Sequence, residues 1–406
     1  MTQRFFAAGA IVLAAALAWA GAARADEKHY APGISDSEIK LGQTMPYSGP
    51  ASAYGAIGRA EMAYFRMVND QGGVNGRKIT LISLDDGYSP PKTLEQTRKL
   101  VEQDGVAFIF GTLGTPTNMA IRKYMNDRKV PQLFIATGGT QFGEPKDFSW
   151  TMPFAPPSYR IEGSIYGRYI LANKADAKVA VLYQNDDLGK DLLDGLKDGL
   201  GDRAAKMIVA TATYEVTDPK IDSQIVALQG SGADTLFTAA TPKFAAQSIR
   251  TAYDIGWKPL HFVDYAGSAV SAVLVPAGLE KSVGLISIAY LKDPTDPRWR
   301  DDAGFKDWLA WMKKYNPDAD ISEIYNVVGY SSAMLMVEVL KQCGNDLTRE
   351  HIMKQATSLH DVTLPMLQPG IVLNTGPTDY FPVKQMRPVR FDGKTWVPFG
   401  DLMAGR

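Results

Sequence analysis

The chain has 406 residues, 43 Lys and Arg against 44 Asp and Glu, and a formal net charge of −1 at pH 7. Nucleic acid is not an expected partner, because binding phosphates calls for a basic stripe or patch and the sequence shows none. Cys343 is the only cysteine, so no intramolecular disulfide can form.

The N-terminal segment has the pattern of an export signal. Arg4 is followed by a nearly continuous apolar run over residues 5–20, and Ala23-Arg24-Ala25 supplies small residues for cleavage. We expect a signal peptide over residues 1–25, cleaved before Asp26. A membrane anchor, the alternative, would need a longer apolar run, so we expect no stable insertion of the mature chain. No cysteine stands at the cleavage site to take a lipid, and we therefore do not expect a lipoprotein.

Beyond residue 25, the sequence repeats a cycle of a β-rich run, a turn of small residues and an amphipathic helical pattern. Strands are predicted at residues 39–44, 78–85, 106–111, 132–136, 178–183, 206–214, 235–239, 261–263 and 284–289. Continuous apolar runs at 106–110 and 179–182 are typical of strands buried on both faces of a parallel sheet. This alternation predicts a doubly wound α/β fold, and the length suggests two domains.

Proline-rich segments mark where the chain is predicted to cross between two sheets. Residues 151–157 include three prolines, which stiffen the connection and exclude a helix, and a helix is predicted directly after them at 158–172. A second crossing is predicted at 287–297, before a Trp-rich helix at 299–314 and a further helix at 328–343. Near the C-terminus, Asp392-Gly393 predicts a hairpin turn.

The junctions from strand to helix are candidate ligand contacts, because ligands of open α/β sheets bind beyond the carboxyl ends of the strands. Thr115 is placed at a helix N-cap, with Pro116 at the first helical position. Free N–H groups and the helix dipole there favour a carboxylate, although Thr115 could instead only cap its own helix. Junctions of similar composition follow at 137–140, 186–189 and 241–242.

Two tyrosines extend this set, since Tyr54 and Tyr88 could wall an apolar pocket. The alternative for each of them is ordinary packing near a loop.

Signatures of catalysis are missing from the sequence. There is no phosphate loop, no dinucleotide fingerprint and no pair of metal-ligating histidines. The closest approach to a nucleophile elbow, residues 329–333, ends in Ala where that motif requires Gly. The acidic pairs at 85–86 and 186–187 are typical of solvated carboxylates in loops. We therefore expect no enzyme activity, no cofactor and no metal.

Four motifs together resemble the type I periplasmic binding proteins of the branched-chain amino acid class. They are Ser48-Gly49-Pro50, the segment 69–76, Asp85-Asp86 followed by Pro91-Lys92, and the segment 111–115. The resemblance runs from about residue 39 to the C-terminus. It implies two Rossmann-like lobes joined by three hinge crossings, with lobe 1 at 36–154 plus 289–381 and lobe 2 at 155–288 plus 382–406. It also implies a periplasmic protein that closes on a small molecule and delivers it to the permease subunits of an ABC transporter.

The resemblance assigns ligand-binding roles to individual residues. The positions that hold a carboxylate fall on Thr115, Gly138 and Thr140, and the position of an aromatic wall falls on Tyr54. All of these residues lie in lobe 1.

Lobe 2 departs from the pattern of the amino acid binders. Leu188 and Thr241 stand where that pattern has tyrosines, and Ala266 stands where it has the acid that neutralises an α-ammonium. Burying an ammonium without a counter-charge is costly, although Asp264 lies two residues away and could substitute.

The sequence thus predicts a receptor for a small carboxylate without an obligatory amino group, either aromatic or aliphatic. Thr115 and Thr140 would hold the carboxylate, and Tyr54 and Leu188 would contact the apolar body. The alternatives are a receptor for branched-chain or other amino acids, or a module that senses a ligand for a signalling partner.

Overall fold

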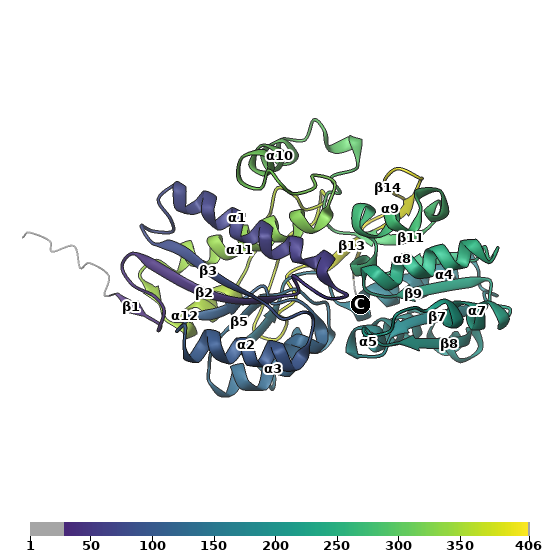
Figure 1. Ribbon diagram of the computed structural model, residues 1–406, viewed down its shortest axis with the longest axis horizontal. Helices are drawn as coiled ribbons and strands as arrows, with labels where there is room; N and C mark the ends of the chain where they lie inside the picture. The colour runs from purple at the N-terminus through teal and green to yellow at the C-terminus, as the bar shows by residue number, and fades with distance from the viewer. Residues whose placement is uncertain (1–27, 405–406) are drawn as a thin grey trace, which may run out of the picture.

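The computed structural model describes residues 28–404, which form two α/β lobes side by side (Figure 1). The signal peptide predicted at residues 1–25 lies outside the described residues. Between residues 28 and 404, no helix has both the length and the apolar character needed to cross a bilayer.

The first lobe is built on a parallel sheet of five strands in the order β3-β2-β4-β5-β6. These are β2 (Glu38–Met45), β3 (Lys78–Asp85), β4 (Phe108–Phe110), β5 (Gln132–Ile135) and β6 (Thr151–Pro153). The helices of this lobe are α1 (Gly55–Asp70), α2 (Pro90–Glu102), α3 (Thr115–Asp127), α10 (Ala303–Tyr315), α11 (Ile324–Cys343) and α12 (Arg349–Ala356). Helices α1 and α11 pack together on one face of the sheet, and α2 and α3 on the other (Figure 1). The short strands β1 (His29–Tyr30) and β12 (Asp346–Leu347) pair in parallel as a separate two-stranded sheet.

The second lobe is built on a sheet in the order β14-β13-β11-β10-β9-β7-β8, with β15 pairing on β13. Its parallel strands are β7 (Val179–Gln184), β8 (Ile208–Tyr214), β9 (Thr235–Ala239), β10 (Leu260–Val263) and β11 (Ile286–Ala289). Antiparallel strands from the C-terminal segment complete it, namely β13 (Gln385–Phe391), β14 (Trp396–Pro398) and β15 (Met403–Ala404). The helices are α4 (Tyr159–Asn173), α5 (Asp187–Leu200), α6 (Ala204–Met207), α7 (Asp222–Gly230), α8 (Pro242–Asp254) and α9 (Val275–Ala277).

The order of the strands requires the chain to pass between the lobes three times. It passes between β6 and α4, between β11 and α10, and between α12 and β13. The two-lobed α/β fold expected from the sequence is confirmed, while the exact lobe boundaries stay a prediction.

Several element boundaries differ from the sequence-based expectations. The strand expected to begin at residue 206 begins at Ile208, because α6 occupies the residues before it. The Trp-rich helix begins at Ala303 rather than at residue 299, because the Asp302 side chain accepts the N–H of Phe305 and caps it there. Helix α11 begins one turn early, at Ile324. The expected hairpin is confirmed as the antiparallel pair β13–β14.

Glycines allow α4 and α5 to pack with their backbones in contact. A Cβ atom added at Gly195 would lie 2.3 Å from the carbonyl oxygen of Arg160, and one at Gly163 would lie 2.3 Å from that of Leu192. No side chain fits in these places. The helix that carries Leu188 toward the first lobe is therefore fixed by close backbone packing.

Candidate ligand-binding site

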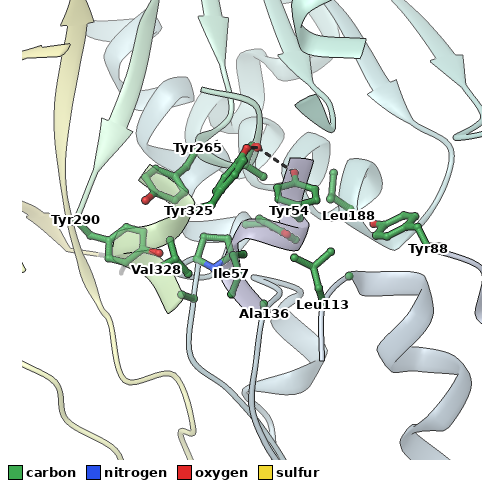
Figure 2. Close-up of a pocket in the computed structure, with 15 residues that line it drawn as sticks. Tyr54, Ile57, Tyr88, Leu113, Ala136, Leu188, Tyr265, Tyr290, Tyr325 and Val328 are labelled. Carbon is green, nitrogen blue, oxygen red and sulfur yellow. Dashed lines mark hydrogen bonds between the residues drawn. The ribbon is translucent and has the colours of Figure 1, made fainter. Parts of the chain in front are cut away.

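An apolar pocket lies where the two lobes meet (Figure 2). It is lined by Tyr54, Ile57, Tyr88, Leu113, Gly114, Ala136, Ala155, Pro156, Tyr159, Leu188, Tyr265, Ala266, Tyr290, Tyr325 and Val328. Six of these residues are tyrosines and none carries a charge. The volume within which the centre of a water molecule can lie is about 40 Å³. This volume is room for roughly three waters.

Two tyrosines of the first lobe bridge to one carbonyl of the second. Tyr54, directly before α1, and Tyr325, in the first turn of α11, each donate from their hydroxyl to the backbone oxygen of Ala266 at 2.9 Å (Figure 2). Their ring centroids are 4.9 Å apart. Burial raises the pKa of both phenols well above 10.0, so both hydroxyls keep the proton that they donate.

Tyr88 is held against the pocket in a conformation that costs energy. Its backbone φ is 61°, in the left-handed region that bulky residues rarely adopt. The ring covers Gly114, where an added Cβ would lie 2.5 Å from the Tyr88 Cε2 atom. The Asp86 carboxylate accepts the Tyr88 N–H at 2.9 Å and fixes the turn. Backbone strain of this kind concentrates at ligand sites, where the surrounding structure maintains it.

Leu188 and Thr241, the two departures from the amino acid binders, lie in different surroundings. Leu188 lines the pocket at the start of α5, where the Asp186 side chain accepts its N–H at 3.0 Å. Thr241 is buried and does not line the pocket. Its hydroxyl lies 3.2 Å from Gln184 Oε1 and 3.3 Å from the Tyr214 hydroxyl, so its polar capacity is used within the second lobe.

The three expected carboxylate contacts do not line the pocket. Thr115 is the first residue of α3, and the residue at the N-cap is Gly114, so the predicted N-cap position of Thr115 is wrong. Its hydroxyl makes no capping bond and lies 2.7 Å from the Thr137 hydroxyl, which also contradicts the alternative that Thr115 only caps its helix. Gly138 is covered by Tyr159, whose Cδ1 atom would lie 2.7 Å from a Cβ added there.

Thr140 lies away from the pocket, and its polar groups join the two lobes. Its N–H donates to the Asp191 carboxylate of α5 at 2.8 Å, and its hydroxyl lies 2.8 Å from the Ser158 hydroxyl. Neither Thr140 nor Thr115 lines this pocket, and their role as carboxylate contacts stays a prediction.

Asp264 is fully buried and immediately precedes the lining residues Tyr265 and Ala266 in the sequence. One carboxylate oxygen accepts the Ala240 N–H at 2.8 Å, and the other has no partner among the described residues. Burial raises the pKa of Asp264 well above 3.8, and the nearby Glu162 carboxyl raises it further.

Comparison with known proteins assigns the family. A family model described as periplasmic binding protein matches residues 38–395. The chain belongs to the periplasmic binding protein family.

Its relatives are of the Leu/Ile/Val-binding class. The Leu/Ile/Val-binding protein homolog 1 of Brucella abortus (strain 2308) is 24% identical over 343 residues, covering 84% of this chain and 85% of the relative. A branched chain amino acid ABC transporter protein from Thermus thermophilus with bound valine superposes with a TM-score of 0.80 at 16% identity, covering 92% and 98% of the two chains. An ABC transporter solute-binding protein from R. palustris in complex with benzoate superposes with a TM-score of 0.74 at 20% identity, covering 91% and 97%.

The family is one of substrate-binding transport proteins, so the expectation that the chain is not an enzyme is confirmed. The acidic pairs serve turns of this periplasmic binding protein. Asp85 accepts the N–H groups of Tyr47 and Ser48, and Asp186 caps α5. The sequence 329–333 lies within α11. Across residues 28–404, no group of three or more His, Cys, Asp or Glu side chains is placed to hold a metal.

Sequence reasoning found Tyr54, Tyr88, Leu188 and Ala266, which all line the pocket of the binding protein. It missed four lining tyrosines, namely Tyr159, Tyr265, Tyr290 and Tyr325. A signal was present for two of them, because Tyr159 follows the first predicted crossing and Tyr290 lies within the second. Both of these tyrosines line the pocket between the lobes.

Proposed function

We propose that this chain is the substrate-binding subunit of an ABC importer and captures a small aromatic or aliphatic acid between its lobes. The mature chain would act free in the periplasm after removal of residues 1–25, and it would pass its ligand to permease subunits. The observation that carries the proposal is the pocket between the lobes, with six tyrosines and no charged side chain among its lining residues.

The lining favours a compact, largely apolar body for the ligand. Leu113, Leu188 and Val328 supply aliphatic walls, and the tyrosine rings supply flat ones. Space for roughly three waters favours a small acid, and a long acyl chain would need the lobes to part. The solved structure with bound benzoate supports this size and chemistry by analogy.

The polar surroundings favour an anionic head group. Gly114 lines the pocket immediately before α3, so the N-terminal end of a 13-residue helix lies at the pocket wall. The helix dipole and the unpaired N–H groups of a first turn stabilise negative charge. The hydroxyls of the lining tyrosines other than Tyr54 and Tyr325 add neutral donors, which suit a carboxylate better than a cation.

A receptor for amino acids is a second candidate, and one observation favours it. The unpartnered oxygen of Asp264 is a buried acceptor on the residue that immediately precedes Tyr265 and Ala266 in the sequence. An α-ammonium that reached it would satisfy this oxygen and stabilise the ionised carboxylate.

Matched ligand pairs separate the two candidates. Hydrocinnamate and phenylalanine differ only in the α-ammonium, and so do isocaproate and leucine. We expect isothermal titration calorimetry on the mature protein to give tighter binding of the acid in each pair. Tighter binding of phenylalanine and leucine would overturn the proposal in favour of the second candidate, and Asp264→Asn should then abolish the preference.

The transport role needs a test in the cell. Deleting the gene should abolish uptake of the radiolabelled acid that the purified protein binds, and a plasmid copy should restore uptake. Normal uptake in the deletion strain, together with a lost transcriptional response to the acid, would instead indicate a sensor for a signalling partner.

A further inference from the structure

Tyr159 separates the expected carboxylate contacts from the pocket. It is the first residue of α4 and is 3% exposed. Its N–H donates to the Gly138 carbonyl at 2.8 Å, and its ring lies on the Gly138 backbone. Tyr159 lines the pocket, whereas Thr115 and Gly138 do not. A guest in this pocket therefore meets the tyrosine before it meets those two residues.

Donors of the first lobe converge on the Tyr159 phenol. Gly138, Thr137 and Thr115 lie close enough to the phenol for their polar groups to lower its pKa, although burial outweighs them and raises it. The Thr115 and Thr137 hydroxyls lie 2.7 Å apart, and the Gly139 N–H donates to the Thr137 hydroxyl at 3.1 Å. The groups that the sequence assigns to a ligand carboxylate are thus directed at a side chain of the protein itself.

We propose that the Tyr159 hydroxyl is the direct hydrogen-bond donor to the ligand carboxylate, and that Thr115, Thr137 and Gly138 are positioning residues that act through it. This inference rests on the proposed function, because it names the group that holds the ligand's head.

The chemistry of a phenol supports this role. A hydroxyl oxygen has two acceptor sites and one proton. If the nearby Gly138 N–H occupies one acceptor site, the O–H of the phenol is left to donate to a guest in the pocket. Burial also raises the pKa of Tyr159, so the proton is retained. Hydrogen bonds received by an oxygen polarise its O–H and strengthen the bond that it donates.

A double-mutant cycle tests whether Thr115 acts through Tyr159. The variants are Tyr159→Phe, Thr115→Val and the double variant, titrated by calorimetry with the acid that the wild-type protein binds best. We expect Tyr159→Phe to weaken binding about 10- to 100-fold, because a hydrogen bond to a charged group is lost. Thr115→Val should weaken binding only about 2- to 5-fold, and the double variant should bind like Tyr159→Phe alone.

Two further measurements exclude indirect effects. The neutral amide of the same acid should lose much less affinity in Tyr159→Phe than the acid does. Tyr253→Phe is a matched control, because Tyr253 is 48% exposed and lies outside the pocket. This variant should bind the acid with the same affinity as the wild type. Thermal unfolding without ligand reports separately whether each variant is folded.

The outcomes separate this inference from the proposed function. If Thr115→Val weakens ligand binding as much in the Tyr159→Phe background as in the wild type, Thr115 contacts the ligand directly. This result would overturn the inference. Unchanged or tighter binding by Tyr159→Phe would overturn it as well. If the wild type binds leucine and no acid without an amino group, the proposed function fails, and the same cycle with leucine still tests Tyr159, because leucine carries a carboxylate.

Discussion

The shared carbonyl of Ala266 gives a quantitative prediction for closure of the lobes. Tyr54 and Tyr325 both donate to it at 2.9 Å, and all three residues are buried. The perturbation is Tyr54→Phe, Tyr325→Phe and the double variant, each of which removes only hydroxyl groups. When the lobes part, water can bond to the carbonyl, so the changes act on the closed state and therefore on ligand affinity.

The number of hydrogen-bond donors left on the Ala266 carbonyl sets the size of the expected loss in ligand affinity. Either single variant leaves one donor in place, so we expect a loss near the lower limit for a neutral hydrogen bond, about 0.5 kcal/mol or roughly 2-fold in affinity. If the effects were additive, the double variant would lose about 1 kcal/mol. It instead leaves a buried carbonyl without a partner, which costs about 2–3 kcal/mol, or roughly 30- to 150-fold in affinity.

Titration calorimetry of the four proteins with one ligand measures this coupling directly. We expect the affinity of the double variant to be well below the value obtained by combining the two single losses. The thermal unfolding temperature without ligand should change little. Additive losses, or a single variant as weak as the double, would show that the two hydroxyls do not share the carbonyl and would refute this account of closure.

Three further predictions concern stability. Gly195→Ala forces a methyl group into the α4–α5 contact and should lower the free energy of unfolding in urea by about 1–3 kcal/mol, whereas Gly230→Ala, with nothing within 4 Å, should not. Burial raises the pKa of Glu61 from 4.5 to about 8. Its contribution to the free energy of unfolding is therefore present below pH 4.5 and is lost as the pH rises toward about 8. Glu61→Gln should remove this loss of stability from a pH series of urea melts. Asp186→Ala removes the cap of α5 and should cost about 1 kcal/mol in the same assay.

The fold follows from local patterns in the sequence. Uninterrupted apolar runs such as 179–182 predicted strands buried on both faces, and the structure places β7 inside the second sheet. Prolines near residue 156 predicted the first crossing for a backbone reason that requires no tertiary information. The errors lie at element ends such as residues 206 and 299, where single capping bonds and helical turns decide the boundary.

The site was less predictable, because it depends on contacts between distant segments. Tyr54 and Leu188 were found from strand-to-helix junctions, and both line the pocket. The expected carboxylate contacts Thr115, Gly138 and Thr140 stay a prediction and do not line the pocket, and no local pattern reveals that Tyr159 covers Gly138. Tyr325 was missed for the same reason, since its partner Ala266 is 59 residues away in the sequence.

The bonds that close the lobes bear on the choice between an acid and an amino acid. At Ala266, where the resemblance expects an acidic side chain, this protein offers a backbone carbonyl that its own tyrosines already engage. An ammonium that bound there would compete with Tyr54 and Tyr325, whereas an acid without an amino group would leave both bonds intact. Closure through the protein's own hydroxyls thus removes the need for a ligand that bridges the lobes with charge at both ends. Under the proposed function, the remaining selectivity rests on how well the ligand's body fills the apolar pocket and on the hydrogen bond from Tyr159 of α4.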